Sequence, residues 1–507
     1  MPAKSDKFLS SITGAALLIS FTSILTKGLG FLREVLFANY FGLEEEFDIY
    51  LVGAVIPLTI NVIIYHLTQN YLIPTYNKLK KNDKSDLDKF INTNFSIFVL
   101  GGVLLSILLY FLSHFIINIY LSGVDIETLN IAENIFNIFL ITIPFNCAIS
   151  VISIVHHLNF NFKYPAYSQL ILNMSFILFL ILLTDFYGIY VIPWAYIFSS
   201  LFQLLYLTRK INIRYRLLPS INHLRKYKKL ISSSIWFIIL IESISQLYFV
   251  SDRFFYEYIP TGGIASINYA QTIFHLPISI LSASLATVIF PKFSELINSN
   301  SKEELKKKIN ESFNTIVIIF VPIVILYLEY GGFFLKIFFE RGKFTSEDTL
   351  MTYNVLFFLS LSLVFYSIYS IINKLIYSLG LIKNLFFITF AGISLKIILN
   401  FLFAEEMKQN GLALSTSISY MFFFFTSIIL VNKKTGFKFT RRLLWELIFH
   451  FSNGLLCLIL TKLLAILIDT NLELLEIILF IILFITNAIF TKQSTAILFY
   501  KLYSLRR

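Results

Sequence analysis

The sequence predicts an all-α polytopic membrane protein of about fourteen transmembrane helices, with two six-helix lobes related by a parallel repeat and two further C-terminal helices. Three observations predict this class. Hydrophobic residues make up 57% of the chain and charged residues 14%, whereas soluble domains average about 25% charged residues. About fourteen apolar stretches are each long enough to cross a bilayer, and Lys and Arg gather in alternate connections between them.

The first two spans need the most interpretation. Lys4 and Lys7 precede the first span, which has no small-residue cleavage site before Lys27, so we expect an uncleaved helix rather than a signal peptide. The second is too long for one simple crossing. Pro57 and Pro74 are expected to kink or end it, and residues 35–47 to form a re-entrant or interfacial stretch. The predicted spans are 8–31, 35–74, 93–120, 131–155, 165–184, 188–208, 230–251, 264–290, 313–330, 352–379, 384–404, 410–431, 443–468 and 473–491.

The connections separate by charge. Basic clusters follow the second, sixth, eighth and twelfth spans, at residues 78–89, 209–229, 302–308 and 433–442. The opposite connections hold acidic residues, such as Asp125, Asp185 and Glu405. The positive-inside rule therefore places both termini in the cytoplasm and requires an even number of spans. No connection exceeds about two dozen residues, so we expect no soluble catalytic domain between the spans.

The composition also excludes several kinds of partner. The net charge of +11 lies in short connections, which is a topology signal and predicts no nucleic-acid binding. The two cysteines, Cys147 and Cys457, fall inside apolar segments and fit neither a disulfide framework nor a metal site. We therefore expect no cofactor, no metal and no catalytic residue.

An internal repeat is indicated at an offset of 220 residues. At this offset Arg33 aligns with Arg253, and Gly42 with Gly262. Asp48 aligns with Asn268 and Pro57 with Pro277 in the same register. Six spans separate the copies, so the copies are parallel, and two such bundles rocking around a shared cavity would give alternating access. The predicted domains are residues 1–229 (N-terminal lobe with its basic linker), 230–440 (C-terminal lobe) and 441–507 (helices thirteen and fourteen with a cytoplasmic tail).

Several ionisable residues lie within the predicted spans or within two residues of their ends. Each costs about 2.5–3.5 kcal/mol at the bilayer centre unless it faces a bundle interior or a wet cavity. A polytopic protein that keeps several of them handles something polar inside the membrane, which predicts a transporter. These residues are Lys27, Arg33, Glu242, Asp252, Arg253, Lys374, Lys396 and Lys462.

Four segments resemble the MurJ/MviN family, the lipid II flippases of the multidrug/oligosaccharidyl-lipid/polysaccharide exporter superfamily. They are TKGLGFLREVLFANYFG at 26–42 with Asp48 after it, SINYAQTIFHLPISILSASLATVIFPKFSEL at 266–296, FFLKIFFERGKFTSEDT at 333–349 and NGLALSTSISY at 410–420. The resemblance implies two six-helix lobes, a central cationic cavity, and helices thirteen and fourteen forming a lipid-facing groove. It also implies a monomer in the bacterial cytoplasmic membrane that moves an undecaprenyl-diphosphate-linked saccharide to the outer leaflet.

The resemblance places the site as well. A diphosphate needs fixed cations, which Arg supplies as bidentate donors and Lys as a point charge. The expected substrate-binding residues are Lys27, Arg33, Arg253, Lys374 and Lys396. The expected gating or ion-pair residues are Asp48, Glu242, Asp252, Asn400 and Thr416.

The sequence departs from the family at three cationic positions. The family has two arginines just after the helix-two proline, where this chain has Asn61 and Val62, and one on helix eight, where it reads Gln271 and Thr272 after Tyr269-Ala270. These losses favour a related lipid-linked saccharide, such as a polysaccharide or O-antigen-type glycolipid, as the alternative cargo.

A further departure concerns a sodium ion that some members bind between helices seven, eleven and twelve. Here Lys396 lies one turn before Asn400, and we hypothesise that its ammonium replaces the ion and pairs with Glu242, Asn400 or Thr416. A buried lysine needs such a partner to keep its proton.

Other interpretations remain open. Lys27, Arg33 and Lys462 could snorkel to headgroups. Asp252 and Arg253 could form an interfacial pair, and Lys374 could form a structural one. His66 could couple protons or be an interior hydrogen-bonded histidine. A cation-coupled drug exporter would need an acidic cavity, whereas these spans lean basic. A membrane glycosyltransferase or acyltransferase could use the acidic cluster Glu44, Glu45, Glu46 and Asp48, but it has no need of a lobe repeat.

Overall fold

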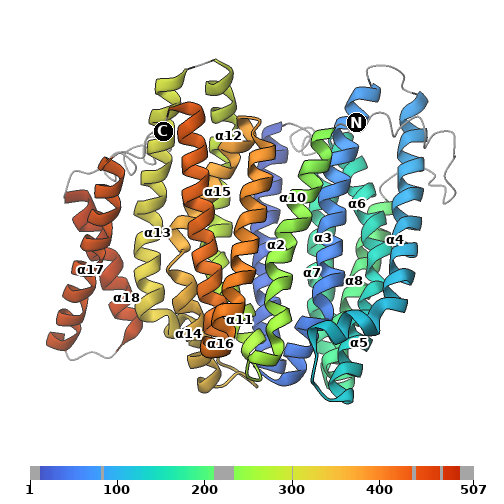
Figure 1. Ribbon diagram of the computed structural model, residues 1–507, viewed down its shortest axis with the longest axis horizontal. Coiled ribbons are helices and arrows are strands. Elements are labelled where there is room, and N and C mark those ends of the chain that lie inside the picture. The colour runs from blue at the N-terminus through green and yellow to red at the C-terminus, as the bar shows by residue number, and fades with distance from the viewer. Residues whose placement is uncertain are drawn as a thin grey trace. The chain divides into compact units, whose positions relative to one another are not determined.

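The computed structural model describes residues 12–80, 85–209, 233–299, 301–436, 441–468 and 472–490, and these residues form helices joined by short connections, without a strand among them (Figure 1). The chain divides into two compact units. The first comprises residues 1–265 with 341–344, and the second comprises residues 266–340 with 345–507. The predicted boundary between lobes, at residues 229 and 230, stays a prediction.

The first unit holds the helices before Ala265. In chain order they are α2 (Ile12–Phe41), α3 (Glu45–Lys80), α4 (Ser85–Tyr120), α5 (Ile126–Leu140), α6 (Thr142–Leu158), α7 (Lys163–Tyr187), the short η1 (Gly188–Tyr190), α8 (Val191–Thr208), α10 (Ser233–Val250) and the 3-10 segment η2 (Ser251–Tyr258).

The second unit holds the helices that follow. They are α11 (Gly263–Pro277, whose first turn belongs to the first unit), the π-helical η3 (Ile278–Ser282), α12 (Ala283–Asn298), α13 (Lys302–Phe339), α14 (Ser346–Ser360), α15 (Leu363–Ser378), α16 (Ile382–Thr435), α17 (Arg441–Ile468) and α18 (Glu473–Phe490). In Figure 1, α17 and α18 lie beside α13.

Seven described helical segments, or eight if the bent pair α14–α15 forms one span, are long and apolar enough to cross a membrane. Two of the seven are hairpins rather than single crossings. Gln203 on α8 donates a hydrogen bond to Ser168 on α7 at 3.2 Å, although a straight helix would separate residues 35 apart by about 52 Å. The chain therefore turns back at Gly188.

The 54-residue α16 is the second hairpin. A straight helix of that length would measure about 81 Å, against a hydrocarbon core of about 30 Å. The backbone leaves helical geometry at Lys408. A β-carbon added at Gly411 would lie against the carbonyl oxygen of Phe403, eight residues earlier, which requires a reversal.

With α16 counted as two crossings, and α5–α6, α11–α12 and α14–α15 as one broken crossing each, the described residues contain fourteen helical crossings. Large apolar side chains lie exposed along many of them, among them Phe111, Phe186, Phe401 and Leu467. Such surfaces suit lipid rather than water. The predicted fold class, a multi-pass all-α membrane protein with fourteen helices, is confirmed.

The predicted re-entrant stretch at 35–47 is wrong. Residues up to Phe41 continue α2, because the apolar run EVLFANYF contains no helix breaker. Gly42 then ends the helix with φ +54°, and a β-carbon there would lie 2.5 Å from the carbonyl oxygen of Lys343. Neither Pro57 nor Pro74 ends α3, which runs through both. Transmembrane helices tolerate proline because neighbouring groups satisfy the freed carbonyls.

Backbone conformations repeat at the predicted offset of 220 residues. Gly42 and Gly262 have φ of +54° and +80°, and each precedes a helix. Gly188 and Lys408 have φ of +53° each, with ψ of −135° and −134°, and each forms the reversal of a hairpin. This agreement between the copies does not depend on side-chain identity, so it supports the repeat independently of the sequence landmarks.

The offset also accounts for the non-glycine residues with positive φ in the described chain, Phe160 and Lys408. Phe160, with φ +58°, corresponds to Gly380, with φ +69°. In both pairs one copy has glycine and the other has a side chain in the same left-handed region. The shared backbone path imposes the strain, because a side chain at positive φ is disfavoured.

Candidate functional site

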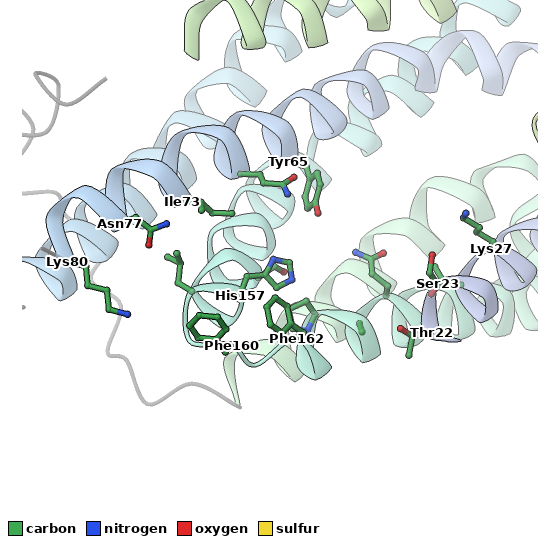
Figure 2. Close-up of a pocket in the computed structure, with 17 residues that line it drawn as sticks. Thr22, Ser23, Lys27, Tyr65, Ile73, Asn77, Lys80, His157, Phe160 and Phe162 are labelled. Atoms are coloured by element: carbon green, nitrogen blue, oxygen red, sulfur yellow. The ribbon is translucent and has the colours of Figure 1, made fainter. Parts of the chain in front are cut away.

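A cavity of about 830 Å³, lined by both apolar and polar side chains, lies in the first unit (Figure 2). Four helices contribute its walls. Its lining residues are Thr22, Ser23, Thr26 and Lys27 from α2; Tyr65, Gln69, Ile73, Asn77 and Lys80 from α3; Ser153, His157 and Leu158 from α6; Phe160 and Phe162 from the following turn; and Pro165, Ala166 and Gln169 from α7.

The α3 wall follows from helical spacing. Tyr65, Gln69, Ile73, Asn77 and Lys80, called here the α3 stripe, recur every three or four residues and therefore lie on one face of the helix. Tyr65 and Lys80, at the two ends of the stripe, are 15 residues apart, which corresponds to about 22 Å along the helix axis. Figure 2 shows Lys80 and Lys27 at opposite ends of the cavity.

The turn between α6 and α7 brings aromatic side chains to the cavity. The backbone N–H of Phe160 donates to the carbonyl of His157 at 3.0 Å, and the N–H of Asn161 donates to that of His156 at 2.9 Å. These bonds close a tight turn with Phe160 in left-handed geometry, and the ring of Phe162 lies 5.5 Å from that of His157. The turn therefore presents Phe160 and Phe162 to the cavity, as Figure 2 shows.

The charged side chains among the described lining residues of the cavity are basic. Two lysines line it, together with a histidine, three amide side chains and four aliphatic hydroxyl groups, and none of these described lining residues is acidic. Amides and hydroxyls donate and accept hydrogen bonds, whereas the lysines supply positive charge only. Such a lining suits a ligand with an anionic group and a neutral, hydroxyl-rich part.

The second copy of the repeat has apolar residues at part of this lining. The positions 220 residues after the first four members of the α3 stripe lie on α12 and are Leu285, Ile289, Phe293 and Ile297. The equivalent of Lys27 is Leu247. Other polar lining positions stay polar in the second copy: Ser23, Ser153 and Gln169 correspond to Ser243, Asn373 and Thr389. The two copies therefore differ at the α3 stripe and at Lys27.

The structure separates the two expected cations of helix one. Lys27 is exposed and lines the cavity. Arg33 is outside the cavity lining and lies among aromatic rings: its guanidinium donates to Tyr196 Oη at 2.8 Å and pairs with Glu34 at 2.9 Å. It also lies 5.5 Å from the centre of the Phe176 ring. Arg33 therefore helps to pack α2 against α7 and α8, and its role toward substrate stays a prediction.

Asp48 and its neighbours form a buried cluster. The Asp48 carboxylate accepts hydrogen bonds from the backbone N–H groups of Gly262 and Ala265, each at 2.6 Å, and so caps the first turn of α11. Asp252 and Arg253 in η2 are 2% and 8% exposed. Burial lowers the pKa of Arg253, and the nearby carboxylates of Asp252 and Asp48 oppose that shift.

The acidic cluster predicted as a possible metal site is otherwise engaged. Glu44 pairs with Lys343 at 2.6 Å, and Asp48 binds the two backbone N–H groups. Across the residues that the structure describes, no group of three or more His, Cys, Asp or Glu side chains could hold a metal ion.

Glu242 on α10 lies near His66 on α3, with 3.7 Å between its carboxylate oxygen and the imidazole Nε2. Both side chains are partly exposed. His66 is therefore a neighbour of Glu242 within the first unit. The proposed pairing of Glu242 with Lys396 stays a prediction, because Lys396 belongs to the second unit.

The second unit holds the other expected site residues. Lys396 and Asn400 lie one turn apart on α16 and are both 0% exposed, and Thr416 is 2% exposed. A fully buried lysine supports the view that this region is built around a charge. Lys374 on α15 is exposed.

Sequence reasoning missed most of the cavity's neutral lining. Gln69, Asn77 and Gln169 carry no charge, and Lys80 was assigned only to a basic connection. The available signal was the spacing of the α3 stripe, which places the amides Gln69 and Asn77 eight residues apart on one face of an otherwise apolar span.

Comparisons with known proteins agree with this architecture. A family model described as "Lipid II flippase MurJ" matches residues 37–486. A probable lipid II flippase MurJ of Buchnera aphidicola subsp. Schizaphis graminum is 25% identical over 422 residues, which cover 80% of each chain. The lipid II flippase MurJ of Thermosipho africanus is 27% identical over 414 residues, covering 81% of this chain and 83% of that protein.

Solved structures show the same fold. A lipid II flippase MurJ in an inward closed conformation matches with a TM-score of 0.79 and 24% identity, covering 94% of this chain and 99% of the other. An inward-facing multidrug resistance MATE family transporter matches with a TM-score of 0.69 at 12% identity, covering 82% and 98%. At these identities the likeness concerns the fold alone.

Proposed function

Because this chain belongs to the MurJ family of lipid II flippases, we propose that it moves an undecaprenyl-diphosphate-linked saccharide, lipid II or a related cell-envelope precursor, across the bacterial cytoplasmic membrane. The family is one of transporters, not of enzymes. The polar headgroup would cross by alternating access between the two six-helix copies.

The observation that carries the proposal is the cavity of the first unit. It holds Lys27 and Lys80, and none of its described lining residues is acidic. The equivalents of Lys27, Gln69 and Asn77 in the second copy are apolar. A diphosphate needs fixed cations to leave water, and charge-assisted hydrogen bonds are the strong ones in such a site. A drug exporter for cations would need the opposite charge.

The orientation of the cavity follows from charge placement. The basic end of α3 and the basic connection after it belong on the cytoplasmic side under the positive-inside rule. The cavity would then receive a headgroup made in the cytoplasm, with Lys80 near the cytoplasmic surface and Lys27 deeper in the membrane. A monomer with both termini in the cytoplasm is the arrangement expected for this cycle.

A second candidate cargo is a polysaccharide or O-antigen-type glycolipid. Two of the positions where the family has arginines make local hydrogen bonds here: Asn61 donates to Thr142 Oγ1 at 3.0 Å, and Thr272 donates to the carbonyl of Asn268 at 3.0 Å. A third, Val62, is exposed and apolar. A cargo that makes fewer ionic contacts with the protein would still bind when these arginines are absent.

Genetic replacement tests the proposal. The gene is expressed in bacteria depleted of their own lipid II flippase, and growth is measured together with the exposure of lipid II at the outer surface. We expect rescue by the natural protein and by Lys27→Arg. Lys27→Gln should lower the transport rate about tenfold, because a charge-assisted contact is lost.

Lys78→Gln is the matched control. Lys78 is exposed on the last turn of α3 and is not part of the cavity lining, so its loss should leave transport unchanged. Rescue of a surface-polysaccharide flippase mutant without rescue of lipid II transport would select the second cargo. Failure of both, with the protein correctly inserted, would contradict the flippase proposal.

A further inference from the structure

The two cations of the cavity lie too far apart for one diphosphate. The α3 stripe alone extends about 22 Å from Tyr65 to Lys80, and Lys27 lies at the other end of the cavity from Lys80. A diphosphate held at Lys27 therefore leaves Lys80 without an anionic partner from the ligand.

We propose, building on the proposed function, that Lys80 recognises a second anionic group on the headgroup, a carboxylate carried by the saccharide or by a peptide attached to it. The preferred cargo is then a doubly anionic headgroup: the diphosphate lies at Lys27, a neutral saccharide follows, and the carboxylate lies at Lys80.

The neutral polar side chains of the cavity suit the saccharide. Gln69, Ser153 and Gln169 line the cavity and offer amide and hydroxyl groups, which can bond to sugar hydroxyls as donors and acceptors. Asn77 lies one turn before Lys80 on the same face of α3, so an amide and an ammonium could bind one carboxylate together.

Two aromatic side chains, Phe160 and Phe162, line the same cavity as Lys80. The side chain of Phe160 is 65% exposed. Burying its ring would remove apolar area from water, yet the fold leaves the ring exposed. Its left-handed backbone corresponds to Gly380 in the other copy, so the turn carries a strained aromatic residue where glycine would be easier to accommodate. The strained backbone at Phe160 and the presence of a second ring, Phe162, in the lining fit a role for both rings in contacting a ligand in the cavity.

A simpler explanation of Lys80 is that it only orients the protein in the membrane. Lys78 separates the two explanations, because both lysines are exposed on the last turn of α3 and only Lys80 lines the cavity. An orientation signal depends on the number of charges in the connection, so either lysine would serve it equally. Recognition of a ligand in the cavity depends on Lys80 alone.

The experiment compares full-length Lys80→Gln and Lys78→Gln with the natural protein in lipid nanodiscs. Two probes are used: an undecaprenyl-diphosphate disaccharide-peptide with free carboxylates, and the same molecule with its carboxylates amidated. We expect the natural protein and Lys78→Gln to bind the free carboxylate form about five- to tenfold more tightly than the amidated form. Lys80→Gln should bind both forms equally, at the affinity of the amidated form.

The outcomes separate this inference from the proposed function. If the natural protein binds both probes but without preference, or if Lys78→Gln loses the preference as Lys80→Gln does, the second anionic contact is wrong and the flippase proposal stands. If the natural protein binds neither probe, both proposals are wrong. Lys27→Gln should weaken the binding of both probes equally. If it weakens the binding of the free carboxylate form only, then Lys27 binds the carboxylate and Lys80 the diphosphate, the reverse of the proposed assignment.

Discussion

At the scale of single residues, contacts with distant parts of the chain determine the structural role of each charged side chain. Asp48 was expected to be a gating or paired acid, and it accepts hydrogen bonds from two N–H groups more than two hundred residues away. Arg33 finds Tyr196 at a separation of 163 residues. The sequence gives the charge of each residue and its place in a span, but it cannot give partners that depend on how distant helices pack.

The left-handed backbone at Lys408 supports a stability prediction. Its equivalent in the other copy is Gly188, with the same φ and a ψ one degree away. We expect Lys408→Gly to raise the free energy of unfolding by about 1 kcal/mol, because relief of strain exceeds the added freedom of the unfolded chain. Thermal unfolding of the purified protein in detergent would measure this.

Glu406→Gly is the control for that substitution. Glu406 is exposed, two residues earlier in α16, in helical geometry, so glycine there should lower stability by up to about 1 kcal/mol. If both substitutions destabilise the protein equally, Lys408 carries no strain that glycine can relieve.

At the scale of elements, one lysine joins three helices of the second unit. Lys462 Nζ on α17 lies 3.0 Å from Glu329 on α13 and 2.9 Å from Glu476 on α18. Tyr330 donates to the same Glu476 oxygen at 2.8 Å, and its ring centre lies 4.7 Å from the ammonium. Snorkelling, one interpretation of this lysine from the sequence, does not describe a residue with two carboxylate partners.

We expect Lys462→Met to lower the free energy of unfolding by about 2 kcal/mol, because it leaves two carboxylates facing each other without a cation. Thermal unfolding in detergent would report the loss. Adding Glu329→Gln and Glu476→Gln should restore most of it. Lys336→Met, at an exposed lysine of α13, should change little, and an equal loss there would argue against a specific role for the cluster.

Hydropathy predicted the helices well and their junctions poorly. Apolar runs gave the crossings because a bilayer requires internally bonded backbone. The same rule could not show that α2 continues to Phe41, because a helix ends where the backbone turns and not where hydropathy falls. In the cavity, charge identified Lys27, whereas Gln69 and Gln169 have no signal beyond their spacing and the fold of their neighbours.

At the scale of the whole molecule, charge placement predicts which end of each helix faces the cytoplasm. Single cysteines would be introduced after Cys147 and Cys457 are replaced, and labelled in intact cells with a membrane-impermeant maleimide. Cysteines at Ser122 and Glu405 should react from outside, and those at Lys78 and Lys306 only after the cells are opened. External labelling at Lys78 or Lys306 would contradict the fourteen-crossing topology.

The shared turns of the two copies, Gly42 with Gly262 and Gly188 with Lys408, have an evolutionary consequence. A six-crossing ancestor returns to the membrane face from which it started, so tandem gene duplication needs only a short linker and no inversion of either copy. The ancestral gene product would have worked as a symmetric homodimer. Fusion freed each half to diverge, so one half could acquire recognition of its cargo while the other kept the inherited scaffold.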